Sequence, residues 1–424
     1  MSLAALAEAV RRAQPAPGSL LSVKGEVLRL ALPDAVVGER VRVDGHLAEV
    51  VGFDVTEAIA LPLEPVHALT SGAPVVRVEA QPSLPTASAL VGRVIDGLGR
   101  PLDEGPPLPP PTWPLHRRAP DPLHRRPVDA PLALGIRVLD ALCTVGQGQR
   151  LGLEAGPGAG KSTLLRQIAA QAQVDAVVIA LIGERGREVG AFLQRLPPIA
   201  RQRSVVVLAR ADDPPLLWLR AAETATAIAE EFREENQSVL LLVDSLTRVA
   251  RAIRTVGVAA GEPVTRRGFP VSLAAEVARL LERAANSDRG RLTALYTVLV
   301  EGEAADDPVA EEARALLDGH IVLDGVRAGA GHFPAVDVAR SISRCMPDLV
   351  APAHQRAATT LRRWLAGLAR QQDLIAVGAY QRGADPDADA GLRKRDALDA
   401  FLRQAPSEDA DFAETARRLL GLCG

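Results

Sequence analysis

The sequence predicts an α/β protein in three parts: a small N-terminal β-barrel, a central parallel sheet with a glycine-rich loop, and a helical C-terminal domain. Short alternating runs of apolar and polar residues occupy residues 20–80, and apolar runs alternate with helical stretches from residue 132. Helical periodicity returns over residues 350–424. The expected domains are 1–85, with a short leading helix, then 86–348 and 349–424.

Composition limits the classes of function. A chain of 424 residues is too long for one ordinary domain. Lys and Arg number 49 against 52 Asp and Glu, a net charge of −3, which argues against nucleic-acid binding driven by bulk charge. Aromatic residues make up only 3 %, so aliphatic side chains must fill the core and few surfaces remain for base stacking.

The cysteines and the hydropathy pattern predict a cytosolic location. Cys143, Cys345 and Cys423 are odd in number and scattered, which is typical of free thiols in a reducing compartment. No apolar run reaches the ~18 residues of a membrane span, and no secretory signal is visible. Membrane contact is therefore expected only through partners.

The N-terminal part is expected to begin with a short amphipathic helix within residues 1–17. Alternating strands follow at 22–30, 40–43 and 47–53, with Asp44 and Gly45 as a turn. This spacing fits a small barrel, and a sandwich of similar size fits it as well. Residues 101–131 are rich in proline, which predicts a linker-like or wrapping segment rather than a central strand or a helix.

The central part reads as a buried parallel sheet. Near-continuous apolar runs alternate with helical stretches such as 216–235, and the runs are 149–153, 176–182, 204–209, 238–243 and 292–300. Ligands of such sheets bind at the carboxyl ends of the strands. In the C-terminal part, Leu361, Leu365 and Leu368 keep a helical period, and Phe401, Leu402, Ala416 and Leu419 predict further helices.

Residues 155–163 read AGPGAGKST and lie between an apolar run and a helical pattern. A strand, a glycine-rich turn and Lys-Ser at a helix start form the phosphate-binding loop of nucleoside triphosphatases. Glycines let several backbone N–H groups point at one phosphate, and the helix N-terminus adds partial positive charge. Lys161 is expected to reach the β- and γ-phosphates, and the Ser162 hydroxyl to bind Mg²⁺.

Two acidic residues end apolar runs near this loop. Asp244 follows 238–243 and is suited to hold Mg²⁺ through water, although such an Asp is also a common helix cap. Glu184 lies in GERGRE (183–188), where it is suited to orient or deprotonate the attacking water. In that stretch Arg185 or Arg187 would meet γ-phosphate charge. An exposed charged turn with local ion pairs is the alternative.

Two residues near the end of the central part are weaker candidates. Arg344, in SISR (341–344), follows the last expected sheet strand and is placed to reach a nucleotide in a neighbouring subunit. Most such arginines are simply surface residues. Phe333, likewise, is either a ligand contact or a core aromatic.

Taken in order, these motifs resemble one family, the type III secretion ATPases of virulence injectisomes and flagella, which are related to the catalytic subunits of rotary ATP synthases. The resemblance spans roughly residues 92–383. It is carried by GRVIDGLGRPLD (92–103), AGPGAGKST (155–163), GERGREV (183–189), VDSLTR (243–248), GEP (261–263), TALYTVLVEG (293–302), LDGHIVL (317–323) and SISR (341–344).

The resemblance implies a barrel, a RecA-like core and a helical C-terminal domain, with ATP and Mg²⁺ as ligands. It assigns Glu184 as the catalytic carboxylate supported by Arg185, and Arg344 as a finger acting across a subunit interface. Phe333 occupies the position that packs on adenine. The implied phosphate contacts are Gly156, Gly158, Ala159, Gly160, Lys161, Ser162 and Thr163, and the implied Mg²⁺ contacts are Ser162, Glu188 and Asp244.

The same resemblance implies partners and a location. It predicts a homohexamer whose loop 380–387 faces a central stalk protein. A stator or regulator subunit, the export gate at the inner membrane and chaperone–effector complexes are further expected partners, and nucleic acid is not. The chain is expected in the cytoplasm, associated peripherally with the inner membrane through the secretion apparatus.

Some positions depart from the family pattern. Pro157 removes one N–H group from the phosphate loop. Residues 261–272 lack two of the usual prolines and a tyrosine, Leu323 is followed by Asp324 and Gly325 where relatives carry Ser-Arg, and the N-terminal arm is short. These differences concern docking and turnover rate more than the reaction.

The leading hypothesis is ATP hydrolysis that powers chaperone release and substrate unfolding for export. Within the family, 294–296 and 266–268 look more like the injectisome branch than the flagellar one. A non-catalytic nucleotide-binding ring subunit is the alternative of another class, which Glu184 argues against. An RNA translocase is disfavoured by the acidic net charge and the scarce aromatics.

Overall fold

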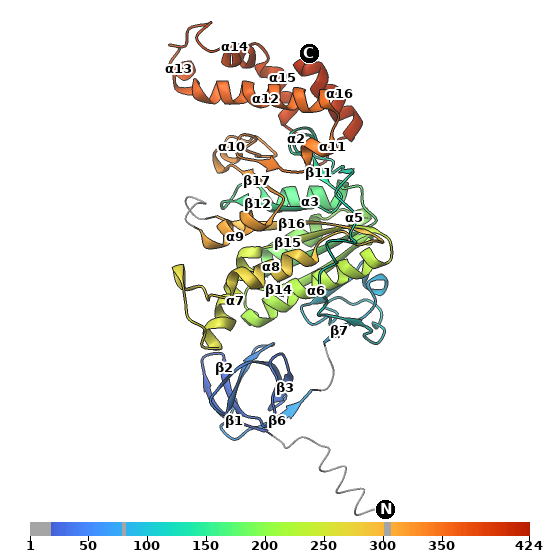
Figure 1. The fold of residues 1–424 in the computed structure, drawn as a ribbon, viewed down its shortest axis with the longest axis vertical. Coiled ribbons are helices and arrows are strands. Elements are labelled where there is room, and N and C mark those ends of the chain that lie inside the picture. The colour runs from blue at the N-terminus through green and yellow to red at the C-terminus, as the bar shows by residue number, and fades with distance from the viewer. Residues whose placement is uncertain (1–17, 79–81, 301–306) are drawn as a thin grey trace, which may run out of the picture.

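The computed structural model describes residues 18–78, 82–300 and 307–424. The molecule is elongated, with a barrel at one end, a large sheet in the middle and a group of helices at the other end (Figure 1). The helix expected within residues 1–17 lies outside the described residues.

The N-terminal strands close into a barrel in the order β1-β2-β5-β4-β3-β6, so the barrel and not the sandwich is formed. Its interior is packed with aliphatic side chains such as Leu28, Val41 and Val50, because alternate residues of each strand point inward. The strands are β1 (Gly18–Lys24), β2 (Val27–Ala31), β3 (Arg40–Val43), β4 (His46–Asp54), β5 (Glu57–Pro62) and β6 (Pro74–Arg77).

The single strand predicted over 22–30 was wrong. The chain turns back at Gly25, which has a left-handed φ of 61°, and β1 pairs antiparallel with β2. Apolar alternation continues through this tight turn, so periodicity alone does not reveal the reversal. The turn predicted at Asp44 and Gly45 is confirmed, and both residues have positive φ angles.

The large sheet has eight strands in the order β18-β17-β12-β16-β15-β13-β14-β8. Every pairing is parallel except that of β17 with β18. The strands are β8 (Val94–Asp96), β12 (Arg150–Ala155), β13 (Ala176–Glu184), β14 (Ser204–Arg210), β15 (Ser238–Asp244), β16 (Arg291–Leu299), β17 (Gly319–Leu323) and β18 (Ile342–Ser343).

The segment 341–344 was expected to follow the last strand of the sheet. Instead, its central residues form β18, which hydrogen-bonds to β17 at the sheet edge. A two-residue strand is too short to produce a readable alternation, which is why the sequence pattern did not indicate it.

Helices cover both faces of the sheet, as the alternating pattern predicts. On one face Leu153 and Leu242 pack with α2 and α3, and on the other Val178 and Leu241 pack with α6, α7 and α8. The helices of this region are α2 (Arg137–Leu142), α3 (Lys161–Gln171), α4 (Gly186–Arg195), α5 (Pro198–Gln202), α6 (Pro215–Glu234), α7 (Leu246–Ala259), α8 (Leu273–Arg283), α9 (Pro308–Leu316), α10 (Gly325–Gly329) and α11 (Met346–Leu349).

The C-terminal part is helical, as predicted. Its apolar side chains, including Leu361, Leu398 and Phe401, belong to the same hydrophobic cluster as α2 and α3. The helices are α12 (Pro352–Arg370), α13 (Gln372–Ala376), α14 (Pro386–Arg393), α15 (Arg395–Leu402) and α16 (Phe412–Cys423). Three of them, α12, α15 and α16, contact α2, which lies between them and the sheet.

The proline-rich segment 101–131 is almost without regular structure, in agreement with its composition. It contributes β9 (Trp113–Pro114) to a ribbon with β7 (Ser83–Leu84), and β10 (Pro131–Leu132) follows it and pairs with β11 (Val145–Gly146). Short 3₁₀ turns occur at Ala87–Leu90 and Arg266–Gly268. None of the helices in the described ranges is both long and apolar enough to cross a membrane.

Candidate active site

The phosphate-binding loop connects the carboxyl end of β12 to the N-terminus of α3. Gly158 and Gly160 have φ angles of 75° and 87°, a left-handed conformation that residues with a side chain rarely adopt. A Cβ atom added at Gly156 or Gly158 would meet nothing within 4 Å. The glycines therefore leave an open concave backbone at a helix N-terminus, which suits a phosphate group.

Lys161 is the first residue of α3, and its ammonium group contacts two carboxylates. Lys161 Nζ donates to Asp244 Oδ1 in a short ion pair and lies 3.5 Å from Glu184 Oε1. These acids end β15 and β13, which are neighbouring strands. The fold therefore brings together three predicted residues that are far apart in the sequence.

Asp244 is almost fully buried, and a second residue holds it. Thr297 Oγ1, on β16, donates to Asp244 Oδ1 over 2.7 Å. The hydroxyl and the ammonium group compensate the buried negative charge. Thr297 was not predicted as a site residue, although it lies within the motif 293–302.

Glu184 has an unusual electrostatic environment. Its side chain is only 13 % exposed. Burial raises the pKa of Glu184 to about 7, and the charges of Asp244 and Glu188 act in the same direction, whereas Lys161 opposes them. A carboxylate with a pKa near neutrality is a suitable general base because it takes up and releases protons at physiological pH.

Arg185 and Glu188 lie at the start of α4, directly after Glu184. The Arg185 side chain is 82 % exposed, and its nearest charged partner is Glu188 at 3.8 Å. Neither side chain contacts Lys161 or Asp244 through a described hydrogen bond or ion pair. The structure thus places both beside the cluster, with Arg185 directed to solvent.

Phe333 lies against the other side of the phosphate loop. A Cβ atom at Gly160 would come within 3.3 Å of the Phe333 ring, and the ring is 40 % exposed. A small cavity here is lined by Gly160, Thr163, Phe333 and, from the C-terminal part, Gln404 and Pro406. The partly exposed ring is available to pack against a flat apolar group.

Gln404 was not identified from the sequence, and it connects this cavity to the protein interior. Its backbone N–H donates to Phe333 O over 2.9 Å. Its buried side chain donates to Gly135 O over 2.7 Å and accepts from Arg137 N over 2.7 Å. A lone glutamine in a helical region carries no sequence signal for such a position.

Arg344 lies far from the phosphate loop of its own chain. It follows β18, and its backbone N–H donates to Asp318 O at the beginning of β17. The loop begins after Ala155, which pairs with Leu323 at the end of β17. From Asp318, beside Arg344, to Leu323, beside the loop, the strand advances five residues, or roughly 17 Å. The exposed Arg344 side chain donates to Arg314 O over 3.1 Å.

A Mg²⁺ ion would find oxygen ligands here. The residues proposed from the sequence, Ser162, Glu188 and Asp244, offer a hydroxyl and two carboxylates, the ligand type that Mg²⁺ prefers. Within the ranges the structure describes, no three His, Cys, Asp or Glu side chains are grouped to hold a metal alone. This donor set fits a Mg²⁺ ion that also uses phosphate oxygens and water, as Mg²⁺ commonly does.

Fold and site together define a P-loop nucleoside triphosphatase: a parallel sheet with a glycine-rich loop, a lysine, and acids at neighbouring strand ends. In agreement, residues 135–343 match the nucleotide-binding domain of the ATP synthase alpha/beta family. Residues 350–421 match the C-terminal domain of the type III secretion ATPase EscN.

The chain belongs to the type III secretion ATPase family. It is 45 % identical over 406 residues to the Type 3 secretion system ATPase of Sinorhizobium fredii, covering 94 % of this chain and 90 % of the relative. It is 42 % identical to the Flagellum-specific ATP synthase of Pseudomonas aeruginosa, covering 97 % and 94 %. The family predicted from the sequence motifs is thus confirmed.

A solved structure agrees. The assembled ATPase EscN from the enteropathogenic E. coli type III secretion system superimposes with a TM-score of 0.91 and 40 % identity, covering 96 % of this chain and 100 % of EscN. EscN in complex with its central stalk EscO superimposes with a TM-score of 0.88. The predicted barrel, parallel core and helical C-terminal part are therefore confirmed.

Proposed function

We propose that this ATPase hydrolyses ATP with Mg²⁺ to drive protein export through a type III secretion apparatus. The observation that carries the proposal is the position of Lys161, held between Asp244 and Glu184 at the phosphate loop. One ligand in the phosphate loop can therefore reach the Lys161 ammonium group, the Glu184 carboxylate with its pKa near neutrality, and Asp244. ATP synthase family membership supports ATP as that ligand.

Binding of ATP begins with an exchange of partners at Lys161. In the nucleotide-free protein its ammonium group neutralises Asp244 and Glu184. When phosphate enters the loop, Lys161 turns to the β- and γ-phosphates, and backbone N–H groups from Gly158 to Ser162 bind the phosphate oxygens. Thr163 and Gly156 border the same loop. The exchange frees both carboxylates for their own roles.

The freed acids divide the chemistry. A bound Mg²⁺ ion would supply positive charge to the phosphate groups. Ser162 would hold the ion, and Asp244 and Glu188 would contribute through water. Glu184 accepts a proton from the attacking water, or orients it, and Arg185 supports that carboxylate. Burial suits Glu184 to this task because it raises the affinity of the carboxylate for a proton.

Phe333 packs on the adenine ring. Its position beside Gly160 supports this role, because a base attached to a phosphate in the loop would extend toward this face. An aromatic ring offers stacking energy without reading the hydrogen-bonding edge of the base.

Arg344 acts on the nucleotide of a neighbouring subunit. The distance from its own loop, about the length of β12, supports a role in trans, since an arginine side chain does not span it. A head-to-tail interface that closes on itself forms a ring. We propose a homohexamer, in which each site is completed by the next subunit. EscN, a structural neighbour, is described as assembled.

Other partners follow from the family. EscN binds a central stalk, EscO, and in this chain the loop 380–387 is proposed to face such a stalk. Tyr380 donates to Asp389 over 3.0 Å, and Asp389 accepts from Gly383 N, so α14 holds the loop at its first residue and near its middle. A stator or regulator subunit, the inner-membrane export gate and chaperone–effector complexes complete the proposed set, with the chain at the cytoplasmic side of the inner membrane.

The injectisome is the proposed branch of the family. Residues 294–296 (ALY) and 266–268 (RRG) favour it over the flagellar branch. Export of reporter substrates in strains that lack either ATPase tests this assignment. Restoration of injectisome export alone supports it, and restoration of flagellar export alone contradicts it.

The central test is ATPase rate against protein concentration, with mass measured by light scattering, for wild type and Arg344→Ala. We expect specific activity to rise with assembly, and the variant to assemble yet lose about 10³-fold or more in kcat. If a wild-type monomer hydrolyses ATP as fast as the assembly and Arg344→Ala has no effect, the shared-site proposal fails.

A further inference from the structure

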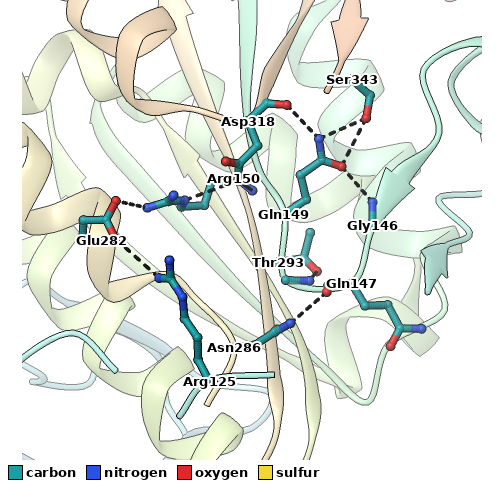
Figure 2. A network of polar contacts seen from close by, with 11 residues as sticks. Arg125, Gly146, Gln147, Gln149, Arg150, Glu282, Asn286, Thr293, Asp318 and Ser343 are labelled. Atoms are coloured by element: carbon teal, nitrogen blue, oxygen red, sulfur yellow. Dashed lines mark hydrogen bonds and ion pairs between the residues drawn. The ribbon is translucent and has the colours of Figure 1, made fainter. Parts of the chain in front are cut away.

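The amino end of β12 carries a buried polar network that has no part in the proposed chemistry (Figure 2). At its centre is Gln149, which is fully buried at 0 % exposure. Gln149 Nε2 donates to Asp318 O and to Ser343 Oγ, each over 3.0 Å. Gln149 Oε1 accepts from Gly146 N over 2.8 Å. One side chain thus joins three segments of the chain.

Two of these contacts lead directly to Arg344. Asp318 O, which accepts from Gln149, also accepts the backbone N–H of Arg344 over 3.0 Å. Ser343 precedes Arg344, and its hydroxyl donates to Thr144 O over 2.7 Å while accepting from Gln149. The backbone on which Arg344 stands is therefore fixed through Gln149.

The position of Arg344 needs such support. β18 is only two residues long and lies at the edge of the sheet, so its own hydrogen bonds hold it weakly. The Arg344 side chain is exposed, with one hydrogen bond to Arg314 O. An arginine that acts on another subunit must keep its place within a fraction of an ångström, since small displacements cost large factors in rate.

We propose that Gln149 is a positioning residue that fixes Arg344 for the nucleotide of the neighbouring subunit. The proposal rests on the proposed role of Arg344. In this role Gln149 does not contact the nucleotide bound by its own subunit. Gln149 directly precedes β12, and the phosphate loop directly follows it. The two features therefore lie at opposite ends of the same strand.

Single substitutions give the first readout. We expect Gln149→Ala to lower kcat by about 10- to 100-fold, with KM for ATP within about twofold of wild type, because only the finger is displaced. Ser343→Ala, which removes a smaller part of the network, tests the same link if Gln149→Ala does not fold. Thr293→Val is the matched control: it is equally buried and loses one hydrogen bond, to Gly148 N, but has no contact with Asp318 or Ser343.

Mixed rings separate a defect in the donated finger from a defect in the subunit's own site. Glu184→Gln subunits have an inactive site but an intact finger. In a random equal mixture with Gln149→Ala, about one quarter of the sites combine a working Glu184 with a finger from a Glu184→Gln neighbour. We therefore expect the mixture to hydrolyse ATP several-fold faster than the mean of its components, and the same for Ser343→Ala.

A mixture of Arg344→Ala with Glu184→Gln is the reference. If the reference gains activity and neither the Gln149→Ala nor the Ser343→Ala mixture does, these residues act within their own subunit and the inference is overturned. If the reference itself gains nothing, the trans role of Arg344 fails, and the inference that depends on it falls with the proposed function.

Discussion

The buried polar side chains at the two ends of the central sheet differ in charge and in hydrogen bonding. At the carboxyl end, Lys161, Glu184 and Asp244 crowd together, and burial raises the pKa of Glu184 to about 7. At the amino end, Gln149 and Asn286 are also buried, but they are uncharged and form several hydrogen bonds each. The charged Arg150 beside them is paired with Glu282 and Asp318.

This difference distinguishes a ligand-binding site from a group of residues that stabilises the fold. Charges gathered without their ligand destabilise the empty protein, which is characteristic of functional sites. Neutral groups with complete hydrogen bonding stabilise one arrangement of the chain. Glu184→Gln and Asn286→Ala should therefore change stability with opposite sign.

The largest effect is expected for Glu184→Gln on catalysis. Loss of the proton acceptor should reduce kcat by about 10²- to 10⁴-fold. ATP binding should persist because Lys161 and the loop are intact. Single-turnover hydrolysis and the affinity for a fluorescent ATP analogue measure the two effects. Glu276→Gln, on the surface of α8, is the control and should match wild type. A Glu184→Gln enzyme that keeps most of its activity would remove Glu184 from the mechanism.

The same variant should stabilise the nucleotide-free protein at high pH. An unfolded glutamate titrates near 4.5, and the folded carboxyl has a pKa of about 7, so the folded state binds its proton more tightly. The contribution of Glu184 to stability therefore falls as pH rises from about 4.5 to 7 and then levels, at a cost of about 3 kcal/mol. Glutamine avoids this cost.

The difference in melting temperature between Glu184→Gln and wild type measures this effect. It should be positive at pH 8 and shrink toward pH 5. Asp140 and Glu231, whose pKa values are also raised to about 7 by burial, are present in both proteins and cancel in the difference. A difference that does not change with pH would contradict the assignment.

At the amino end, Asn286→Ala should destabilise the protein. Asn286 Nδ2 donates to Gln147 O and Pro127 O, and its Oδ1 accepts from Leu292 N, within the network of Figure 2. Loss of these buried bonds should cost about 1–3 kcal/mol. Thermal unfolding measures the loss, and the affinity for ATP should stay unchanged. A variant as stable as wild type would end the contrast between the two ends.

A tenfold effect is expected at Phe333. Phe333→Ala removes a stacking surface, so KM for ATP should rise about tenfold, in line with the 1–3 kcal/mol typical of base stacking on an aromatic ring. Phe333→Tyr keeps the ring and should behave like wild type. Steady-state kinetics distinguish them, and an unchanged KM in Phe333→Ala would show that the ring is structural only.

The smallest effect is expected for Arg185→Ala on stability. The side chain is 82 % exposed and its ion pair with Glu188 is 3.8 Å long, so the free energy of unfolding should change by less than about 0.5 kcal/mol. A severalfold fall in kcat is nevertheless expected if Arg185 supports Glu184. Arg195→Ala, at the exposed C-terminal end of the same helix α4, is the control. A large loss of stability would mean that the residue belongs to the fold rather than to the site.

The sheet was predictable because its strands are buried on both faces and bounded by polar residues. The predicted run 238–243, for example, corresponds to β15 (Ser238–Asp244), which is one residue longer. The turn at Gly25 escaped prediction because apolar alternation continues through it. The strands β8, β17 and β18 lie outside the predicted runs, and β8 and β18, with three and two residues, are too short to show a period. The domain boundaries after residues 85 and 348, and the individual roles of the site residues, stay predictions.

The site was predictable to the extent that its residues follow strands or belong to motifs. Lys161, Glu184 and Asp244 all do, and the fold brings them together. Gln404 and Pro406 reach the loop only because the segment after α15 packs on α3, where Gln167 donates to Ala405 O, and this depends on tertiary contacts and not on local pattern. Gln149 could not be predicted for the same reason, because its proposed role depends on the distant backbone groups to which it hydrogen-bonds.

The closed barrel has a consequence for how copies of this chain tolerate crowding. Its six strands pair around a full circle, and the large sheet ends in strands of three and two residues, β8 and β18. Long unpaired strand edges recruit other chains into aggregates. Over the residues described, such edges are closed or very short. Copies of this chain that lie side by side therefore offer one another few open strand edges at which backbone pairing could begin.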